Sequence, residues 1–292
     1  MPRTSTQLCP SPRARETLVS IGSLDLKGLR QIYSRDNPHW RELVLCAQSA
    51  RERRKRGLSF LEGEHLCEAW LDRWGAPRLI AIADSAQQVP SCRALLLRAQ
   101  AHNPALTILL VNDAMWRDLS QLVQGVSLAF LIETPQPSLP ERLIEDAIYL
   151  DRVQDPGNVG SILRTAVAAG IGRVVTAPGS AWVWSPKVLR AGMGAHFALQ
   201  VHESVAWVDL AARVQMPRLA ARPQNASDLW TTDLRSPALW LFGNEGAGLD
   251  PLIDAETVHW VRIPQSDRVE SLNVSAAAAV CLFEQRRQRL AD

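Results

Sequence analysis

The sequence predicts an α/β protein with two domains, and three observations lead to that fold class. The chain has 292 residues, 47% hydrophobic and 21% charged, which is ordinary for globular proteins and long enough for two domains. Short apolar runs alternate with helical patterns in both halves. Between the halves, residues 133–142 hold three prolines within six positions and show no apolar periodicity, so we expect a semi-rigid linker there.

The linker sets the expected domain boundaries. Residues 1–37 are expected to form a flexible N-terminal tail, because their first part has arginines but no apolar core and so is not a secretory signal. Residues 38–132 are expected to form a smaller α/β domain, and residues 143–292 a larger one.

The smaller domain is expected to contain a largely parallel sheet, because strand and helix patterns alternate in it. The expected helices are residues 40–56, 64–74 and 92–101, and the expected strands are 58–63, 78–83, 106–111 and 126–132.

The larger domain repeats this alternation. The expected strands are residues 147–153, 173–176, 238–242 and 258–263, and the expected helices are 159–169 (closed by Gly170), 186–193, 205–214 and 274–289. Open α/β sheets bind ligands beyond the carboxyl ends of their strands. Three polar loops occupy such positions, at residues 154–158, 243–248 and 264–273.

The first polar loop leads into a helix whose apolar face places Arg164 about 130° away, at 100° per residue. Asn158 is a good N-cap for that helix. Arg164 is therefore either a solvated surface arginine or, since it lies near a helix start at a strand tip, part of an anion site.

The second and third loops are less specific when each is taken alone. Gly243, Gly246 and Gly248 fit neither the dinucleotide fingerprint nor the P-loop, so this segment is either an ordinary glycine turn or a place where a ligand meets the backbone. In the third loop, Ser271 or Asn273 can cap the last helix.

Composition narrows the function classes. The five cysteines are scattered without a CxxC pair and no histidine pair has metal-ligand spacing, so we expect reduced thiols, a cytoplasmic location and no metal site. No apolar run approaches the roughly 18 residues that span a bilayer, so we expect no membrane partner. Residues 1–132 hold 17 Lys+Arg against 12 Asp+Glu, and residues 133–292 hold 15 against 18.

Taken together and in order, the three loops resemble the SpoU (TrmH-like) family of RNA ribose 2′-O-methyltransferases, in the SPOUT superfamily. The family motifs are DPxNxGxxxR, GNExxGL and IPxxxxxxSLNxSxA. The matching positions are Asp155, Pro156, Asn158, Gly160 and Arg164 in the first motif, Gly243, Asn244, Glu245, Gly248 and Leu249 in the second, and Ile263, Pro264, Ser271, Leu272, Asn273, Ser275 and Ala277 in the third. The resemblance covers roughly residues 143–292.

The resemblance implies a Rossmann-like domain with a deep trefoil knot, in which the loops after Phe242 and Ile263 thread past each other. It also implies a homodimer and S-adenosylmethionine as the methyl donor. The residues that it assigns to donor binding are Gly243, Asn244, Glu245, Ile263, Leu272 and Asn273.

By the same resemblance, Arg164 is the central catalytic residue and reaches the site of the partner subunit. A guanidinium does not give up its proton readily, so we expect Arg164 to bind a phosphate and orient the 2′-hydroxyl, while a phosphate oxygen or water takes the proton. The residues expected to order the site by hydrogen bonds are Asn158, Glu245, Ser271 and Asn273.

Residues 40–120 resemble, more loosely, the RNA-binding domain that is often fused in front of this family. Its signature is a basic segment before a strand ending in Glu-Gly, here RERRKR at residues 51–56 and FLEGEH at residues 60–65. The basic residues expected to contact RNA phosphates are Arg51, Arg53, Arg54, Lys55 and Arg56. A solvated helix face is the other interpretation of this run.

Three positions depart from the family pattern: Gln265 and Asp267 stand where Met and Gly are frequent, and Gly192 stands where Ser is common. They affect loop shape and target choice rather than reaction class. We expect methylation of ribosomal RNA rather than transfer RNA. The alternatives are a non-catalytic RNA-binding protein that retains the methyltransferase shell, and a methyltransferase of proteins or small molecules.

Overall fold

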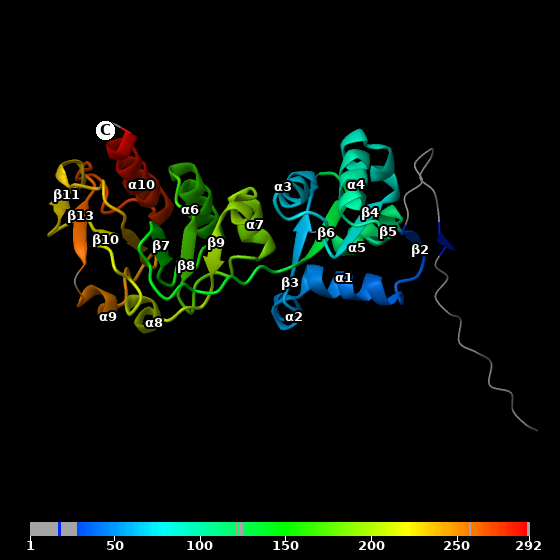
Figure 1. Ribbon diagram of the computed structural model, residues 1–292, viewed down its shortest axis with the longest axis horizontal. Coiled ribbons are helices and arrows are strands. Elements are labelled where there is room, and N and C mark those ends of the chain that lie inside the picture. The colour runs from blue at the N-terminus through cyan, green and yellow to red at the C-terminus, as the bar shows by residue number, and fades with distance from the viewer. Residues whose placement is uncertain (1–16, 19–27, 121, 123–124, 257, 291–292) are drawn as a thin grey trace, which may run out of the picture. The chain divides into compact units, whose positions relative to one another are not determined.

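The computed structural model describes residues 17–18, 28–120, 122, 125–256 and 258–290. The described chain falls into two compact units (Figure 1). The front unit comprises the residues up to Cys67 together with Gly75–Glu133, and the back unit comprises Glu68–Trp74 together with Thr134 onward.

The front unit contains a six-stranded sheet of order β1-β2-β5-β4-β6-β3. Its strands are β1 Thr17–Leu18, β2 Leu29–Ile32, β3 Leu58–Glu62, β4 Leu79–Ala83, β5 Thr107–Val111 and β6 Leu128–Glu133. Strands β2, β5 and β4 pair in parallel, but β6 lies antiparallel to both β4 and β3. The sheet is thus mixed and not largely parallel as expected, because β6 inserts between two strands that share a direction.

Strand β2 falls within residues 1–37, for which the sequence predicts a tail. This segment is instead paired with β5 along its length, and Leu29 and Ile32 are buried in the sheet. Residues 1–16 and 19–27 lie outside the described residues.

The helices of the front unit follow the expected pattern with two corrections. They are α1 Pro38–Gln48, α2 Ala50–Arg56, α4 Pro90–His102 and α5 Asp113–Leu119, together with the start of α3 Glu64–Trp74, whose residues Glu68–Trp74 belong to the back unit. Helix α5 was not predicted. The single helix expected over residues 40–56 is two helices, because Ser49 is extended and its hydroxyl accepts the N–H of Glu52 as the N-cap of α2. Helix α2 ends at Gly57, which adopts the left-handed conformation at φ 63°.

The back unit contains a seven-stranded sheet in which every pairing is parallel, in the order β11-β13-β10-β12-β7-β8-β9. Its strands are β7 Ala147–Leu150, β8 Arg173–Thr176, β9 Gln200–His202, β10 Arg218–Ala221, β11 Ser227–Asp228, β12 Leu239–Phe242 and β13 His259–Arg262. Its helices are α6 Pro156–Ala169, α7 Pro186–Gly192, α8 Trp207–Ala211, α9 Pro251–Asp254 and α10 Val274–Leu290.

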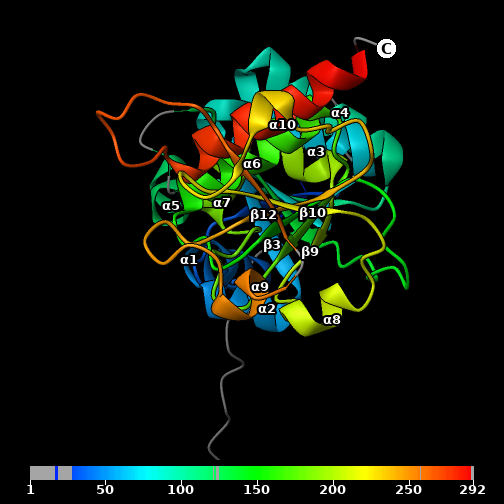
Figure 2. The same cartoon turned by 90° about the vertical axis from the view of Figure 1, so that its left-hand side faces the viewer.

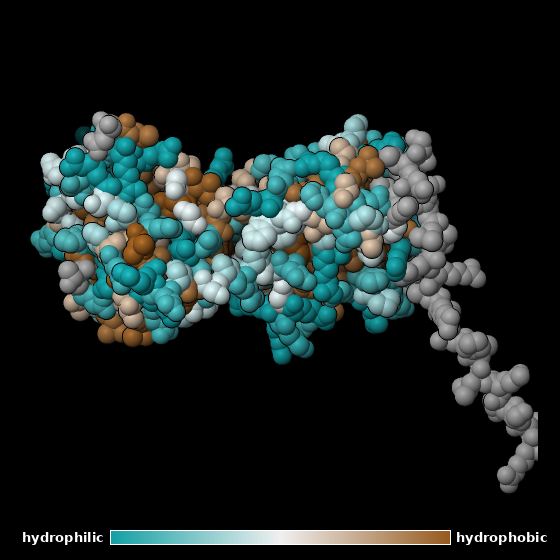
Figure 3. Space-filling model, viewed as in Figure 1, coloured by the Kyte–Doolittle hydropathy of each residue, from teal (hydrophilic) through white to brown (hydrophobic). Residues whose placement is uncertain are grey.

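Two groups of helices cover this sheet. Helix α6 packs against both α7 and α10. Helices α6 and α10 lie above the strands in Figure 1 and Figure 2, whereas α8 and α9 lie below them. Leu210 of α8 and Ile253 of α9 join Tyr149 and Leu241 of the sheet in one buried cluster. The face drawn in Figure 3 is mostly hydrophilic, with hydrophobic groups interspersed.

The last helix is anchored to the sheet by polar contacts, one of them fully buried. The indole N–H of Trp240 on β12 donates to Gln285 Oε1 at 2.9 Å, and Trp240 is fully buried. Arg289 forms an ion pair with Asp146, which precedes β7. These contacts hold α10 across the strands whose loops carry the expected site.

The structure also bears on the expected state of the cysteines and on membrane-spanning helices, for the residues that it describes. Cys46, Cys67, Cys92 and Cys281 are buried and free, whereas Cys9 lies outside the described residues. No helix described here combines the length and the apolar character that a bilayer crossing requires.

Candidate functional site

The loops that follow β7, β12 and β13 meet at one edge of the parallel sheet. Strands β7 and β12 are neighbours, and β10 separates β12 from β13. A cavity of about 700 Å³ opens at this edge, within the range of small-molecule sites. It is lined by the whole loop 243–249, by residues 271–274 and by the tip of β10.

Asn158 connects all three loops through one carboxamide. Its Nδ2 donates to Glu245 Oε1 at 3.0 Å, and its Oδ1 accepts a hydrogen bond from Asn273 Nδ2 at 2.9 Å. The side chain is half-buried at the start of α6. The first motif is therefore joined by direct contact to the second and the third, although these contacts span 87 and 115 residues of the chain.

The expectation that Asn158 caps α6 is wrong. The N-cap is Asp155, whose Oδ1 accepts the N–H of Asn158 at 2.8 Å, and Pro156 follows at the first helical position. Both residue types are good caps, and Pro156 sets the start of the helix three residues earlier. Asn158 is thereby left to face the other two loops.

The carboxylate of Glu245 accepts three hydrogen bonds. They come from Asn158 Nδ2 and from the backbone N–H groups of Asp155 at 3.2 Å and Gln154 at 3.3 Å. Partial burial pushes the pKa of Glu245 upward, but these hydrogen bonds outweigh it and leave the pKa below its usual value. Glu245 is thus held as a carboxylate that fixes the first loop against the second.

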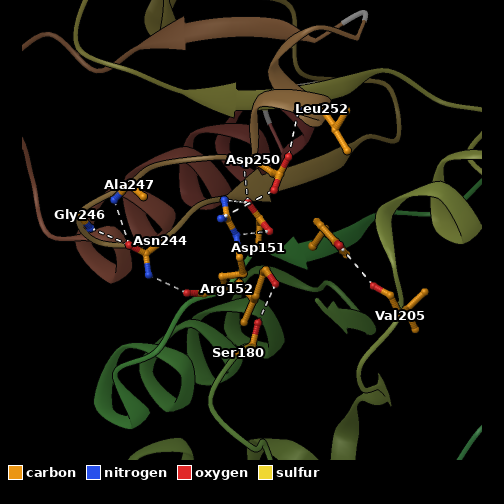
Figure 4. A network of polar contacts seen from close by, with 11 residues as sticks. Asp151, Arg152, Ser180, Val205, Asn244, Gly246, Ala247, Asp250 and Leu252 are labelled. Atoms are coloured by element: carbon orange, nitrogen blue, oxygen red, sulfur yellow. Dashed lines mark hydrogen bonds and ion pairs between the residues drawn. The ribbon is translucent and has the colours of Figure 1, made fainter. Parts of the chain in front are cut away.

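The glycine-rich loop is closed on itself. Asn244 and Gly248 exchange two backbone hydrogen bonds of 2.9 Å, and Asn244 Oδ1 accepts the N–H groups of Gly246 and Ala247 (Figure 4). A Cβ at Gly243 would lie 2.4 Å from the carbonyl carbon of Gly248. Only glycine fits at this position, so the cavity wall here is backbone.

A second set of contacts anchors the ends of this loop to β7 (Figure 4). Asn244 Nδ2 donates to the carbonyl of Arg152 at 2.9 Å, and the N–H of Asp250 donates to Asp151 Oδ2 at 2.7 Å. Arg152 pairs with Asp151 at 3.0 Å and has a left-handed backbone at φ 55°. Sequence reasoning missed these residues, and their one signal was a charged pair directly after a buried strand.

The third loop supplies Asn273 as the cap of α10. Its Oδ1 accepts the N–H of Ser275 at 2.9 Å and that of Ala276 at 3.4 Å. Ser271 and Leu272 are exposed and line the cavity.

Ile263, at the start of the third loop, lines an adjoining cavity of about 100 Å³ that shares Ser271 and Leu272 with the larger one. Gln265 donates to the carbonyls of Val269 and Glu270 at 3.3 Å each, which closes this loop.

Arg164 lies apart from the residues above. Its side chain is exposed on α6 and makes no hydrogen bond or ion pair with the described residues. It is also absent from the residues that line the 700 Å³ cavity. The cavity of a single chain thus does not contain its own Arg164.

The tip of β10 adds residues to the site that sequence reasoning missed. Arg222 lines the cavity beside Trp260 of β13, and its guanidinium carbon lies 4.4 Å from the centre of the Trp260 ring. Strand β10 was not predicted, because the run LAA at residues 219–221, between two arginines, is short and only weakly apolar.

The basic run on α2 divides into one buried and four exposed residues. Arg53 is 5% exposed, and its NH1 donates to the carbonyls of Cys46 and Ala47 at the end of α1. The expectation that Arg53 contacts RNA is therefore wrong: it satisfies the last carbonyls of a helix. Arg51, Arg54, Lys55 and Arg56 are exposed, and Arg56 pairs with Glu52 at 3.1 Å.

Gly192, one of the departures from the family pattern, has a structural reason. A Cβ there would lie 2.5 Å from Cε1 of His196. The His196 ring is buried, its Nε2–H donates to the carbonyl of Val183 at 3.0 Å, and burial lowers its pKa to about 4. The neutral imidazole takes the space that a side chain at position 192 would need.

Comparisons with known proteins identify related methyltransferases. The family model described as SpoU rRNA Methylase matches residues 146–283. An uncharacterized tRNA/rRNA methyltransferase of Synechocystis is 32% identical over 279 residues, covering 90% of this chain and 96% of the relative. The 23S rRNA (guanosine(2553)-2′-O)-methyltransferase RlmP of Bacillus subtilis is 29% identical over 263 residues, covering 88% of this chain and all of the relative.

Crystal structures show the same fold. An AdoMet-bound rRNA methyltransferase from Sinorhizobium meliloti has a TM-score of 0.77 at 26% identity, covering 89% of this chain and 98% of that protein. An RNA methyltransferase of the TrmH family from Porphyromonas gingivalis has a TM-score of 0.72 at 29% identity, covering 86% and 98%.

Proposed function

The chain belongs to the SpoU rRNA methylase family, and we propose that it methylates a ribose 2′-hydroxyl of structured ribosomal RNA with S-adenosylmethionine. One observation carries the proposal: Asn158 joins Glu245 and Asn273 beside a 700 Å³ cavity. A shell without activity has no need for that joined set, and the named relatives in Bacillus and Pseudomonas are rRNA 2′-O-methyltransferases.

The cavity fits the donor in size and lining. Its wall at Gly243 is bare backbone, which allows close approach of a flat nucleoside. Gly243, Asn244, Glu245, Leu272 and Asn273 line it, and Ile263 lines the adjoining recess. S-adenosylmethionine supplies a methyl group on a positively charged sulfur, and the carboxylate of Glu245 favours positive charge nearby.

The role of Arg164 is to position the acceptor. Methyl transfer requires the 2′-oxygen to stand in line with the methyl–sulfur bond, and correct alignment of reactants lowers barriers by several kcal/mol. Arg164 holds the phosphate next to the target ribose with a bidentate pair, and a phosphate oxygen or water accepts the proton. Asn158, Glu245, Ser271 and Asn273 keep the loops in register around the reacting atoms.

The enzyme works as a homodimer in which Arg164 completes the site of the other subunit. Two features support this: Arg164 is exposed and lies outside its own chain's cavity. The site loops also form a trefoil knot in this proposal. Its support is that the loop after β12 and the loop after β13 line the same cavity.

The front unit binds the RNA. The enzyme acts in the cytoplasm. The exposed basic residues of α2 support a phosphate contact. Folded RNA is recognised mainly by shape and by its backbone, so the front unit selects the structured region and the loops of the back unit select the nucleotide.

The test is methyl transfer from labelled S-adenosylmethionine by the purified protein to RNA from cells that lack it. We expect label in ribosomal RNA at one position that resists alkaline cleavage, because a 2′-O-methyl group removes the nucleophile of that cleavage. Label in transfer RNA would contradict the substrate, and label in protein or small molecules alone would contradict the reaction class.

A further inference from the structure

The cavity that we assign to the methyl donor is lined by one arginine, Arg222, to which the proposed function gives no role. Among the described residues that line it, Arg222 is the basic one, and the acidic ones are Glu245 and Asp254. Glu245 is engaged by three donors. An arginine in a pocket that also holds two carboxylates favours a ligand with one negatively charged group, which would lie at the arginine.

The guanidinium of Arg222 is held in a fixed position. Its Nε and NH2 donate to the carbonyl of Asn225 at 3.0 and 2.5 Å, and it lies over the ring of Trp260 at 4.4 Å. Its backbone N–H donates to Val261 of β13 at 3.0 Å. Asn225, which supplies the carbonyl, has a left-handed backbone at φ 51°.

This arrangement leaves one end of the guanidinium for a ligand. Arg222 NH1 makes no hydrogen bond with the residues that the structure describes. The side chain is half-buried, so a charge-assisted hydrogen bond there is screened less than one in open solvent. A fixed fork loses little entropy when it pairs with a planar carboxylate.

We propose that Arg222, steadied by Trp260 and Asn225, binds the carboxylate of the amino-acid portion of the methyl donor. The proposal rests on the proposed function, since it takes the cavity as the donor site. The donor has one carboxylate and carries positive charge on its sulfur and its amino group. The arginine thus matches the single anionic group, while the acids that line the cavity suit the cationic part.

The test compares two ligands that differ in the proposed contact. S-adenosylhomocysteine has the amino-acid carboxylate, and 5′-methylthioadenosine lacks the amino-acid portion. Their affinities are measured by calorimetry for the wild type, Arg222→Gln and Arg222→Lys. We expect Arg222→Gln to weaken S-adenosylhomocysteine by about 10- to 100-fold, as for a lost hydrogen bond to a charged group, and to leave 5′-methylthioadenosine within about twofold. Arg222→Lys keeps the charge and should fall between.

Arg262→Gln is the matched control. Arg262 is a neighbouring arginine of β13 that lies outside the cavity and pairs with Asp228 at 3.8 Å, so both affinities should stay at the wild-type values. Equal weakening of the two ligands by Arg222→Gln would overturn the carboxylate contact and indicate a structural role. An unchanged affinity for S-adenosylhomocysteine would overturn it too.

A ligand-side measurement covers the case in which the Gln variant does not fold. The wild type should bind decarboxylated S-adenosylmethionine at least about 10-fold more weakly than S-adenosylmethionine, and equal affinity would refute the contact. Failure of the wild type to bind S-adenosylhomocysteine at all would instead remove the donor site itself, and with it the proposed function.

Discussion

At the scale of single residues, the carboxamide of Asn158 does what no charged or aliphatic side chain would do. It donates to a carboxylate on one side and accepts from an amide on the other. An aspartate of the same size would place a second negative charge against Glu245 and lose the donor. The site is therefore ordered by a neutral residue between a charged one and a helix cap.

The lowered pKa of Glu245 leads to a prediction on stability and pH. A carboxyl group whose pKa is lower in the folded than in the unfolded state stabilises the fold fully above its usual pKa, near 4.5, and loses that effect as pH falls through the folded value. We expect Glu245→Gln to melt at a lower temperature than the wild type at pH 7, and the difference to shrink below about pH 4.5. Melting temperatures measured from pH 7 to pH 3 test this.

Glu270→Gln is the control for Glu245. Glu270 is exposed in the third loop, and its side chain has no hydrogen bond or ion pair among the described contacts, so its variant should follow the wild type at every pH. A melting difference for Glu245→Gln that stays constant from pH 7 to pH 3 would mean that the charge of Glu245 contributes nothing to the fold.

At the scale of helices and strands, α6 must approach α7 closely for the first loop to reach the second. A Cβ at Gly160 would lie 2.4 Å from Cβ of Ala191 and 2.8 Å from the carbonyl oxygen of Val188. We expect Gly160→Ala to cost about 1–3 kcal/mol by overpacking, seen as a lower melting temperature, and to weaken donor binding because Asn158 shifts with α6.

Gly172→Ala provides the matched control for Gly160. It is exposed, its φ is not positive, and no atom lies within 4 Å of a Cβ placed there. Its melting temperature should match the wild type. If Gly160→Ala is as stable as Gly172→Ala, the two helices are not held at the spacing described.

The basic residues of helix α2 have two different roles, one in stability and one in RNA binding, which the sequence alone does not distinguish. Arg53 bonds the end of α1, whereas Arg51, Arg54 and Lys55 are exposed. We expect Arg53→Gln to lower the melting temperature with an unchanged salt dependence of RNA binding. The triple change of Arg51, Arg54 and Lys55 to Gln should leave stability intact and reduce the slope of log K against log salt by roughly two, at about 0.7 per phosphate contact.

Binding isotherms at several salt concentrations decide between these roles. An unchanged slope for the triple variant would remove α2 from the RNA-binding surface. A reduced slope for Arg53→Gln alone, with normal melting, would show that the buried position of Arg53 is not maintained in solution.

Most elements could be predicted because apolar runs and caps are local signals. The left-handed Gly170 closes α6 as expected, and the last helix ends within one residue of its prediction. Strand β10 and the antiparallel direction of β6 could not be predicted, since one has a short run of small residues and the other depends on which strands it pairs with.

The same limit applies to the site. The motifs identify Asn158, Glu245 and Asn273 as functional residues, but not the contacts among them, because capping rules rate Asp155 and Asn158 alike. A charge run predicts solvated side chains and says nothing of the helix end that Arg53 satisfies. What the sequence leaves open in each case is which partner the side chain contacts.

At the scale of the whole molecule, the position of Arg164 bears on how many chains make one site. Arg164→Ala should abolish methylation and leave donor binding nearly intact, since it lies outside the cavity. Asn158→Asp should abolish methylation by disrupting the loops of its own chain. If each site takes Arg164 from the other subunit, these two inactive variants complement each other when mixed.

Random exchange of the two variants makes about half of the dimers mixed, and each mixed dimer holds one complete site of two, so activity should reach about a quarter of the wild type. Methyl transfer after co-refolding or co-expression measures this. Wild type mixed with the double variant is the control: its mixed dimers contain no complete site if Arg164 acts across the interface, and one if it acts within its own chain. An inactive mixture of the single variants, with dimers formed and the control mixture retaining activity in its mixed dimers, would place Arg164 in the site of its own chain. In that case no site of a mixed dimer has both an intact cavity and an arginine.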